Sequence, residues 1–219
     1  MENPRQTSIG KVAYAISVIL HPALMPTVVV LWLLYGVEAL LVVEPRAQLA
    51  LIWLIFFSTF IVPSAMLYFL KRGGSIESMS LRKREERPLP FMITTVFYGF
   101  FTYLFLDQAS FDRLIAFNLV GITTSMFLAT FISRFYKISM HSMGIGGAMG
   151  VFIALQLHYG TWISLRTPIL LFLFLSGLVM SARLYLRAHT MSQVWTGWIL
   201  SLIVNFGALQ LYFEMVSGR

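Results

Sequence analysis

Residues 90–107 read Pro90-Phe-Met-Ile-Thr-Thr-Val-Phe-Tyr-Gly-Phe-Phe-Thr-Tyr-Leu-Phe-Leu-Asp107 and contain no charged side chain before the final aspartate. An α-helix needs about 20 mainly apolar residues to cross the ~30 Å hydrocarbon layer of a membrane. Comparable apolar runs cover residues 12–41, 47–70, 112–133, 143–163, 167–187 and 191–213. The sequence therefore predicts an all-α fold, a polytopic bundle of six to seven transmembrane helices.

The composition agrees with lipid as the surrounding solvent. Of the 219 residues, 58% are hydrophobic and 11% are charged, whereas a soluble domain has about 45–50% apolar and 25% charged residues. No linker is long enough to separate two domains, so residues 1–219 are expected to form a single membrane domain. The chain has no cysteine, which excludes disulfide bonds and thiolate metal sites.

The first apolar run, residues 12–41, is too long for one straight helix. His21-Pro-Ala-Leu-Met-Pro26 interrupts it, and each proline removes a backbone hydrogen-bond donor. A kink or a short re-entrant entry is therefore predicted there. His21 is expected to pack at the break, and the alternative is that it lines the site. No small-residue cleavage site follows Arg5 and Lys11, so this run is expected to be a retained first span and not a removed signal peptide.

The net charge of +7 is concentrated between the apolar runs. This distribution indicates membrane topology or contact with anionic headgroups, and no nucleic-acid partner is expected. With seven spans, one side of the membrane holds twelve of the 16 Lys and Arg residues, namely Arg5, Lys11, Lys71, Arg72, Arg82, Lys83, Arg84, Arg87, Arg134, Lys137, Arg183 and Arg187. The other side holds Arg46, Arg113, Arg166 and Arg219. The positive-inside rule therefore predicts that the more basic side is cytoplasmic, in a bacterial inner membrane.

Three polar clusters lie on that basic side, at residues 80–90, 137–147 and 181–197. They supply two histidines, several arginines and hydroxyl groups, without an acidic cluster to hold a metal. A guanidinium group binds phosphate bidentately, and a histidine can attack phosphorus or protonate a leaving oxygen. The clusters therefore indicate a site for a membrane lipid phosphate, with no metal and no cofactor. The glycines of the second cluster and Gly150 are expected to allow close helix packing.

Within these clusters, three short patterns follow one another along the chain. They are Arg87-Pro88, Ser139-Met-His141, and Arg183 followed after five residues by His189. Their order and spacing resemble the motifs K-x-x-x-x-x-x-R-P, P-S-G-H and S-R-x-x-x-x-x-H-x-x-x-D of the type 2 phosphatidic acid phosphatases. The resemblance extends over roughly half of the chain.

The chain departs from that family at five motif positions. Ser80 replaces the lysine of the first motif, and Ile138 and Met140 replace the proline and glycine of the second. In the third motif, Ala182 replaces the serine and Gln193 replaces the aspartate. Members of the family also commonly act on the outer face of the membrane, whereas the charge distribution here predicts a cytoplasmic site.

The resemblance implies a role for each matched residue. His189 would be the nucleophile that forms a phosphohistidine, and His141 the acid that protonates the leaving lipid oxygen. The phosphoryl oxygens would be held by Arg87, Arg183 and Ser139, with Lys83 or Arg84 in place of the missing lysine. Gln193, four residues after His189, would accept a hydrogen bond from the imidazole, although an amide cannot balance the charge of an imidazolium as a carboxylate does.

These residues predict a metal-independent phosphatase acting on phosphatidic acid, phosphatidylglycerophosphate or a polyprenyl (di)phosphate. The alternative is a relative that kept the anion site but binds or moves lipids without hydrolysis, which the five departures favour. An aromatic prenyltransferase fits less well. That chemistry needs paired aspartate-rich motifs for magnesium, and Asp107 and Asp112 are predicted on the opposite side of the membrane. The choice of lipid and the oligomeric state stay open.

Overall fold

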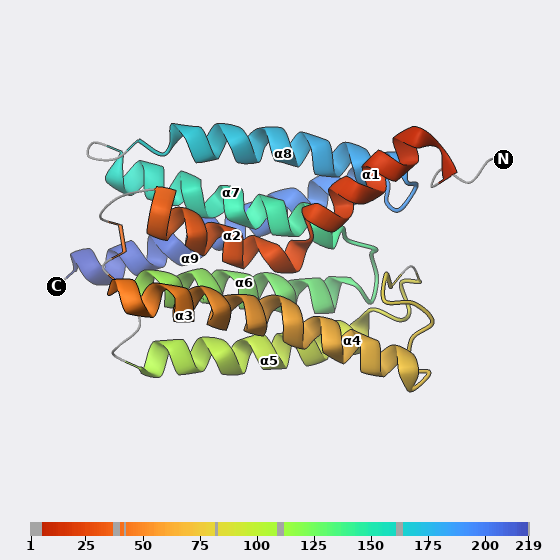
Figure 1. Cartoon of the computed structure of the whole chain (residues 1–219), viewed down its shortest axis with the longest axis horizontal. Helices are drawn as coiled ribbons and strands as arrows, with labels where there is room; N and C mark the ends of the chain where they lie inside the picture. Colours follow the sequence, from red (N-terminus) through yellow and green to blue (C-terminus); the bar gives the residue numbers. More distant parts are fainter. Residues whose placement is uncertain are drawn as a thin grey trace.

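The structure is a computed structural model that describes residues 6–36, 40–41, 43–81, 83–108, 112–160 and 164–218. The described residues form helices without any strand, in an elongated bundle (Figure 1). The α-helices are α1 (Ser8–Ile19), α2 (Met25–Leu31), α3 (Pro45–Phe56), α4 (Val62–Arg72), α5 (Pro88–Asp107), α6 (Arg113–Ile132), α7 (Met140–Tyr159), α8 (Arg166–Tyr185) and α9 (Met191–Ser217). Three short helical segments join them: η2 (Pro22–Leu24), η3 (Trp32–Gly36) and η4 (Phe57–Ile61).

The predicted all-α transmembrane fold is confirmed. Within the described residues, seven helical spans are long and apolar enough to cross a membrane. The first is Ser8–Gly36 and the second is Pro45–Arg72, while α5 to α9 each provide one of the others. The chain is therefore a multi-pass membrane protein.

Several predicted boundaries are wrong by a few residues because capping groups, and not hydropathy, set the helix ends. The first span begins at Ser8 and not at residue 12, since the Thr7 hydroxyl accepts a hydrogen bond from the Gly10 amide at 3.0 Å. The fifth span begins at Met140 and not at residue 143, after the cap Ser139. Such hydroxyls satisfy amides that have no partner inside the helix.

The predicted interruption of the first span is confirmed. Helix α1 ends at Ile19, and the turn η2 separates it from α2. The imidazole Nδ1 of His21 accepts a hydrogen bond from the amide of Ala23 at 3.3 Å and so caps this turn. As a result the two halves of the span pack on different neighbours, α1 on α8 and α2 on α3 and α7.

Helices α7 and α9 form the closest pair in the bundle. A Cβ atom on Gly146 would lie 2.4 Å from the Trp198 carbonyl oxygen, and one on Gly150 would lie 2.3 Å from that of Leu202. Only glycine allows this backbone approach, so the expected packing role of these residues is confirmed. Helix α7 is therefore the central element of the bundle, as its largely buried sequence also indicates.

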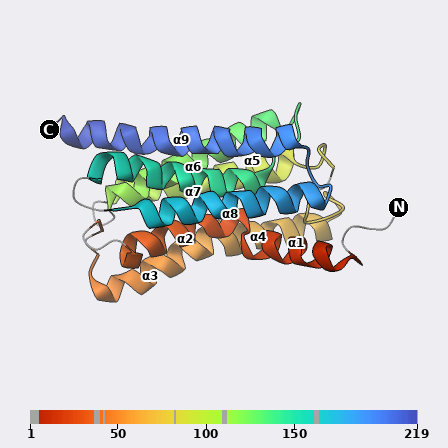
Figure 2. The ribbon, with the colours of Figure 1, turned by 90° about the horizontal axis from the view of Figure 1, so that it is seen from above.

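The segments that carry the three sequence clusters lie at one end of the bundle. The connections α4–α5, α6–α7 and α8–α9 are all at the end near the N-terminus, and the C-terminus lies at the other (Figure 1). The view from above shows the same arrangement (Figure 2). We call the end that holds these three connections the site end, and the end where the C-terminus lies the opposite end.

Candidate functional site

A cavity of about 400 Å³ opens within the site end and extends into the bundle. Five cationic or imidazole side chains lie in its wall: His21, Arg87, His141, Arg183 and His189. Most of the remaining wall is apolar and is contributed by α1, α2 and α4 to α7. The cavity thus combines a polar head with an apolar body, which is the shape of a site for an amphiphile.

Arg87 connects two of the three sequence clusters. It precedes α5, and its guanidinium donates from Nε to the Leu81 carbonyl at 3.0 Å and from Nη1 to the Ile138 carbonyl at 2.8 Å. Its side chain is buried, and burial together with the nearby Arg183 lowers its pKa to about 10. Among the described residues no carboxylate lies within salt-bridge distance of Arg87. Two carbonyl groups therefore fix its position without neutralising its charge.

His189 lies in the turn before α9, and Gln193 sets its tautomer. The Gln193 side-chain oxygen accepts a hydrogen bond from the Thr190 backbone amide at 3.2 Å, and the Gln193 backbone amide donates to the Thr190 hydroxyl at 3.4 Å. These two bonds form a capping box at the start of α9. The same oxygen lies 3.1 Å from His189 Nδ1, so Nδ1 must carry the proton and donate. Nε2 of His189 then holds the lone pair that a nucleophile requires.

The surroundings of His189 keep its imidazole neutral. Burial is the largest cause that lowers the pKa of His189 to about 3, and the charges of Arg87 and Arg183 lower it further. These two arginines come from the start of α5 and the last turn of α8. The effect of both arginine charges on His189 agrees with the position of all three side chains in one cavity wall. An anion bound there would meet two cations and a neutral imidazole.

His141 is in the first turn of α7 and lines the cavity, but its proton already has an acceptor. Its Nε2 is 2.9 Å from the Ser17 carbonyl oxygen, and a carbonyl can only accept, so Nε2 donates. Ser17 belongs to the last turn of α1, where carbonyl groups lack a partner within the helix. The break after α1 therefore creates the acceptor that occupies His141.

His21 lies beside His141, with ring centroids 5.6 Å apart in an edge-on arrangement. The sequence predicted packing at the helix break for this residue, with lining of the site as the alternative, and the structure places it in the cavity wall. Its position next to a helix-breaking proline had favoured the packing role. Two asparagines inside apolar runs, Asn118 and Asn205, also line the cavity, and their amides in a membrane span were a signal that the motif-based reasoning did not use.

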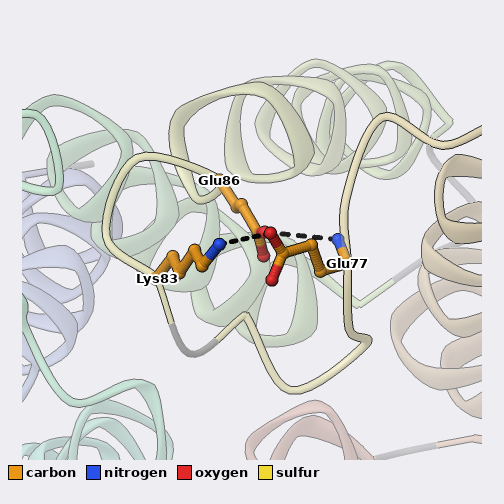
Figure 3. Close-up of polar contacts among 3 residues, drawn as sticks. All are labelled: Glu77, Lys83 and Glu86. Atoms are coloured by element: carbon orange, nitrogen blue, oxygen red, sulfur yellow. Dashed lines mark hydrogen bonds and ion pairs between the residues drawn. The ribbon is translucent and has the colours of Figure 1, made fainter.

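Ser139, Lys83 and Arg84 are not part of the cavity wall. Ser139 is fully buried and caps α7, since its hydroxyl accepts from the Ser142 hydroxyl at 3.0 Å. Lys83 forms an ion pair with Glu77 in the α4–α5 connection, and the Glu77 amide donates to Glu86 (Figure 3). Arg84 donates to the Phe135 carbonyl at 3.0 Å. The structure therefore associates these three residues with the loops that surround the cavity.

The described residues contain no group of three or more His, Asp or Glu side chains that could hold a metal ion. Comparisons of the sequence and the structure with models of known families, with curated proteins and with solved structures found no match.

Proposed function

We propose that this protein is a metal-independent lipid phosphate phosphatase whose nucleophile is His189. The observation that supports this proposal best is the grouping of Arg87, Arg183 and the neutral His189 at the head of a cavity with an apolar body. The resemblance of the three sequence clusters to type 2 phosphatidic acid phosphatases supports the same chemistry. The substrate class is a membrane lipid that ends in a phosphate.

In the proposed reaction, Nε2 of His189 attacks phosphorus while the bond from phosphorus to the lipid oxygen breaks. The guanidinium groups of Arg87 and Arg183 stabilise the charge that builds on the phosphoryl oxygens. The lipid phosphate binds as its monoanion and gives its proton to neutral His141, which passes a proton on to the leaving oxygen. Water then attacks the phosphohistidine, and the proton that it loses passes through His141 to the inorganic phosphate, so that both histidines return to their neutral starting forms.

His141 and Gln193 favour a second candidate, a protein that binds or moves lipid phosphates without hydrolysis. The Nε2–H group of His141 donates to the Ser17 carbonyl, so it must exchange this acceptor for the leaving oxygen. Gln193 offers His189 an amide oxygen, which does not balance an imidazolium as a carboxylate does. Both features are compatible with an anion site that has no turnover.

The test is phosphate release by the detergent-purified protein, with a metal chelator present, from phosphatidic acid, phosphatidylglycerophosphate and a polyprenyl phosphate. We expect release from at least one lipid and a loss of at least about 10³-fold in His189→Ala, because the covalent step is removed. His158→Ala is the matched control, since His158 stacks on Phe213 at the opposite end. Unchanged turnover in His189→Ala contradicts the phosphohistidine, and binding without any release supports the second candidate.

A further inference from the structure

The cavity wall contains a third imidazole, that of His21, which the proposed reaction does not use. Its Nδ1 lies 3.3 Å from the Ala23 backbone amide, and a backbone amide can only donate, so this nitrogen is unprotonated. A neutral imidazole then carries its proton on Nε2. Among the described residues, no acceptor lies within hydrogen-bond distance of this Nε2–H group. The turn after α1 therefore fixes the tautomer of His21 and leaves one N–H donor for a ligand.

Close packing on α7 holds His21 beside His141. A Cβ atom on Gly144 would lie 2.8 Å from the Cα atom of Pro22, so only glycine lets η2 approach the start of α7 this closely. Gly144 follows His141 by three residues and therefore lies on the same face of α7. The ring of Phe60 in η4 also contacts that of His21 edge-on, with centroids 5.7 Å apart. These contacts fix the imidazole in the cavity wall.

The two neighbouring imidazoles differ in what they can offer a ligand. The Nε2–H group of His141 already donates to the Ser17 carbonyl at 2.9 Å, whereas that of His21 has no acceptor among the described residues. The ring centroids are 5.6 Å apart, and a hydrogen bond spans about 3 Å. A single ligand oxygen can therefore lie within reach of both rings, and His21 can donate to it without giving up another bond.

The residues just before α7 connect this pair of imidazoles to the anion site. The Ile138 carbonyl accepts from Nη1 of Arg87 at 2.8 Å. The Ser139 backbone amide donates to the Gln193 backbone carbonyl at 3.3 Å, and the Gln193 side chain in turn contacts His189. The start of α7 is therefore in contact with both the arginine and the histidine sides of the anion site.

The depth of each residue gives the orientation of a bound lipid phosphate. Arg87 and His189 lie outside the membrane-spanning helices, whereas His141 is in the first turn of one such helix and His21 is at the break inside another. A phosphate between Arg87 and His189 thus directs its lipid portion into the bundle. The phosphoester oxygen joins the phosphate to the lipid, so it is the oxygen that faces the two imidazoles.

We propose that His21 is a further substrate-binding residue, whose Nε2–H group donates to the phosphoester oxygen of the bound lipid phosphate. This bond holds the leaving oxygen beside His141 and stabilises the charge that the oxygen gains as its bond to phosphorus breaks. The inference rests on the proposed binding of a lipid phosphate at this site. It does not require hydrolysis, because a donor to this oxygen strengthens binding in either case.

Two amide substitutions separate the roles of the two nitrogen atoms of His21. Asparagine places its side-chain oxygen near the position of Nδ1, so His21→Asn keeps the cap of η2 but has no donor at Nε2. Glutamine reaches the position of Nε2, so His21→Gln restores an N–H group there but loses the cap. We expect lipid phosphate binding to fall about tenfold in His21→Asn, the effect of one hydrogen bond to a charged group, and to recover in part in His21→Gln.

Binding is measured by displacement of a radiolabelled lipid from the purified full chain, with phosphatidic acid, phosphatidylglycerophosphate and a polyprenyl phosphate as competitors. Phosphate release is measured in parallel. Thermal unfolding should give the opposite order of the two variants, with the lower midpoint in His21→Gln, because this variant lacks the cap. His158→Asn is the matched control, since its imidazole stacks on Phe213 at the opposite end, and it should bind lipid as wild type does.

The outcomes separate the role of His21 from the proposed hydrolysis. Binding of wild-type strength in His21→Asn overturns the role of His21, and so does a loss of binding that His21→Gln does not recover. The expected order of binding without phosphate release by wild type supports this role and contradicts the phosphatase. Phosphate release by wild type with unchanged binding in His21→Asn does the reverse. Absence of binding to all three lipids overturns both proposals.

Discussion

The two ends of the bundle use similar polar residues in different ways. At the opposite end, the carboxylate of Asp112 caps α6 by accepting from the Leu114 amide at 2.7 Å, and His158 stacks on Phe213 with ring centroids 3.9 Å apart. At the site end, Arg87, Arg183 and His189 line a cavity together. Polar side chains at a helix end are therefore insufficient evidence of a site, and the cavity with its grouped cations is what separates the two ends.

The largest expected difference between the ends is the side of the membrane that each one faces. We predict that the site end is cytoplasmic, since most Lys and Arg residues lie in its connections. The exposed residues Ser80 and Ser164 can each be replaced by cysteine in this cysteine-free chain. A membrane-impermeant maleimide should label Ser164→Cys in intact spheroplasts and Ser80→Cys only after lysis. The reverse pattern would show the predicted orientation to be wrong.

Loss of a cation at the site end should weaken lipid phosphate binding by about 10–100-fold, the range for a hydrogen bond between charged groups. We expect this for Arg87→Leu and Arg183→Leu, measured by lipid displacement. Arg166→Leu removes an exposed arginine at the opposite end and should leave binding within about twofold, as expected for a screened surface charge. Similar losses in all three variants would contradict the special role of the site end.

Because Arg87 also holds the Leu81 and Ile138 carbonyls, its replacement can disturb the loops themselves. Thermal unfolding of each variant separates this effect from the loss of charge. Arg183→Leu is the second variant for the same comparison. In either variant, weak lipid binding together with the unfolding midpoint of wild type assigns the loss of binding to the anion site.

Acid should destabilise the site end through His189. Its pKa in the folded protein is lowered to about 3, against about 6.5 in an unfolded chain. Below pH 6.5 the unfolded state therefore binds the proton first, and stability falls as the pH decreases towards 3. Between pH 7 and pH 5 the loss should be about 2 kcal/mol.

The measurement for this effect is unfolding of the purified protein at both pH values. His189→Asn lacks the titrating group, so its stability should decrease less on acidification than that of wild type. The same pH dependence in both proteins would show that His189 is accessible to protons in the folded state.

The smallest expected effect comes from Gln193→Glu. Glutamate preserves the capping box at the start of α9, and it places a carboxylate next to Nδ1 of His189. A carboxylate raises the pKa of a neighbouring imidazole and stabilises the positive charge that develops after attack. If the protein is a phosphatase, release should increase several-fold, measured on the lipid that wild type prefers. An unchanged rate in a fully folded variant would show that Gln193 acts only as a helix cap.

The fold was predictable because long apolar runs have one main structural solution in lipid. The grouping of Arg87, Arg183 and His189 was also accessible, since the alternation of spans brings their segments to one end. The hydrogen-bond partner of His141 was not predictable, because it is the backbone carbonyl of Ser17. Every residue has such a carbonyl, so the sequence does not indicate which one the imidazole contacts. The role of Ser139 as a cap was equally hidden, since a hydroxyl before a helix can face either a ligand or an amide.

The break in the first span has a consequence for the order of assembly. Helix α1 packs mainly on α8, which is synthesised almost 150 residues after the first span ends. At 5–20 residues per second, α1 waits on the order of ten seconds for this neighbour. During that time α2 can already pack on α3. The break therefore allows α2 to reach its final packing while α1 still lacks its neighbour α8. We therefore expect the hydrogen bond between His141 and the Ser17 carbonyl of α1 to form late in biogenesis, when α8 is available to hold α1 in place.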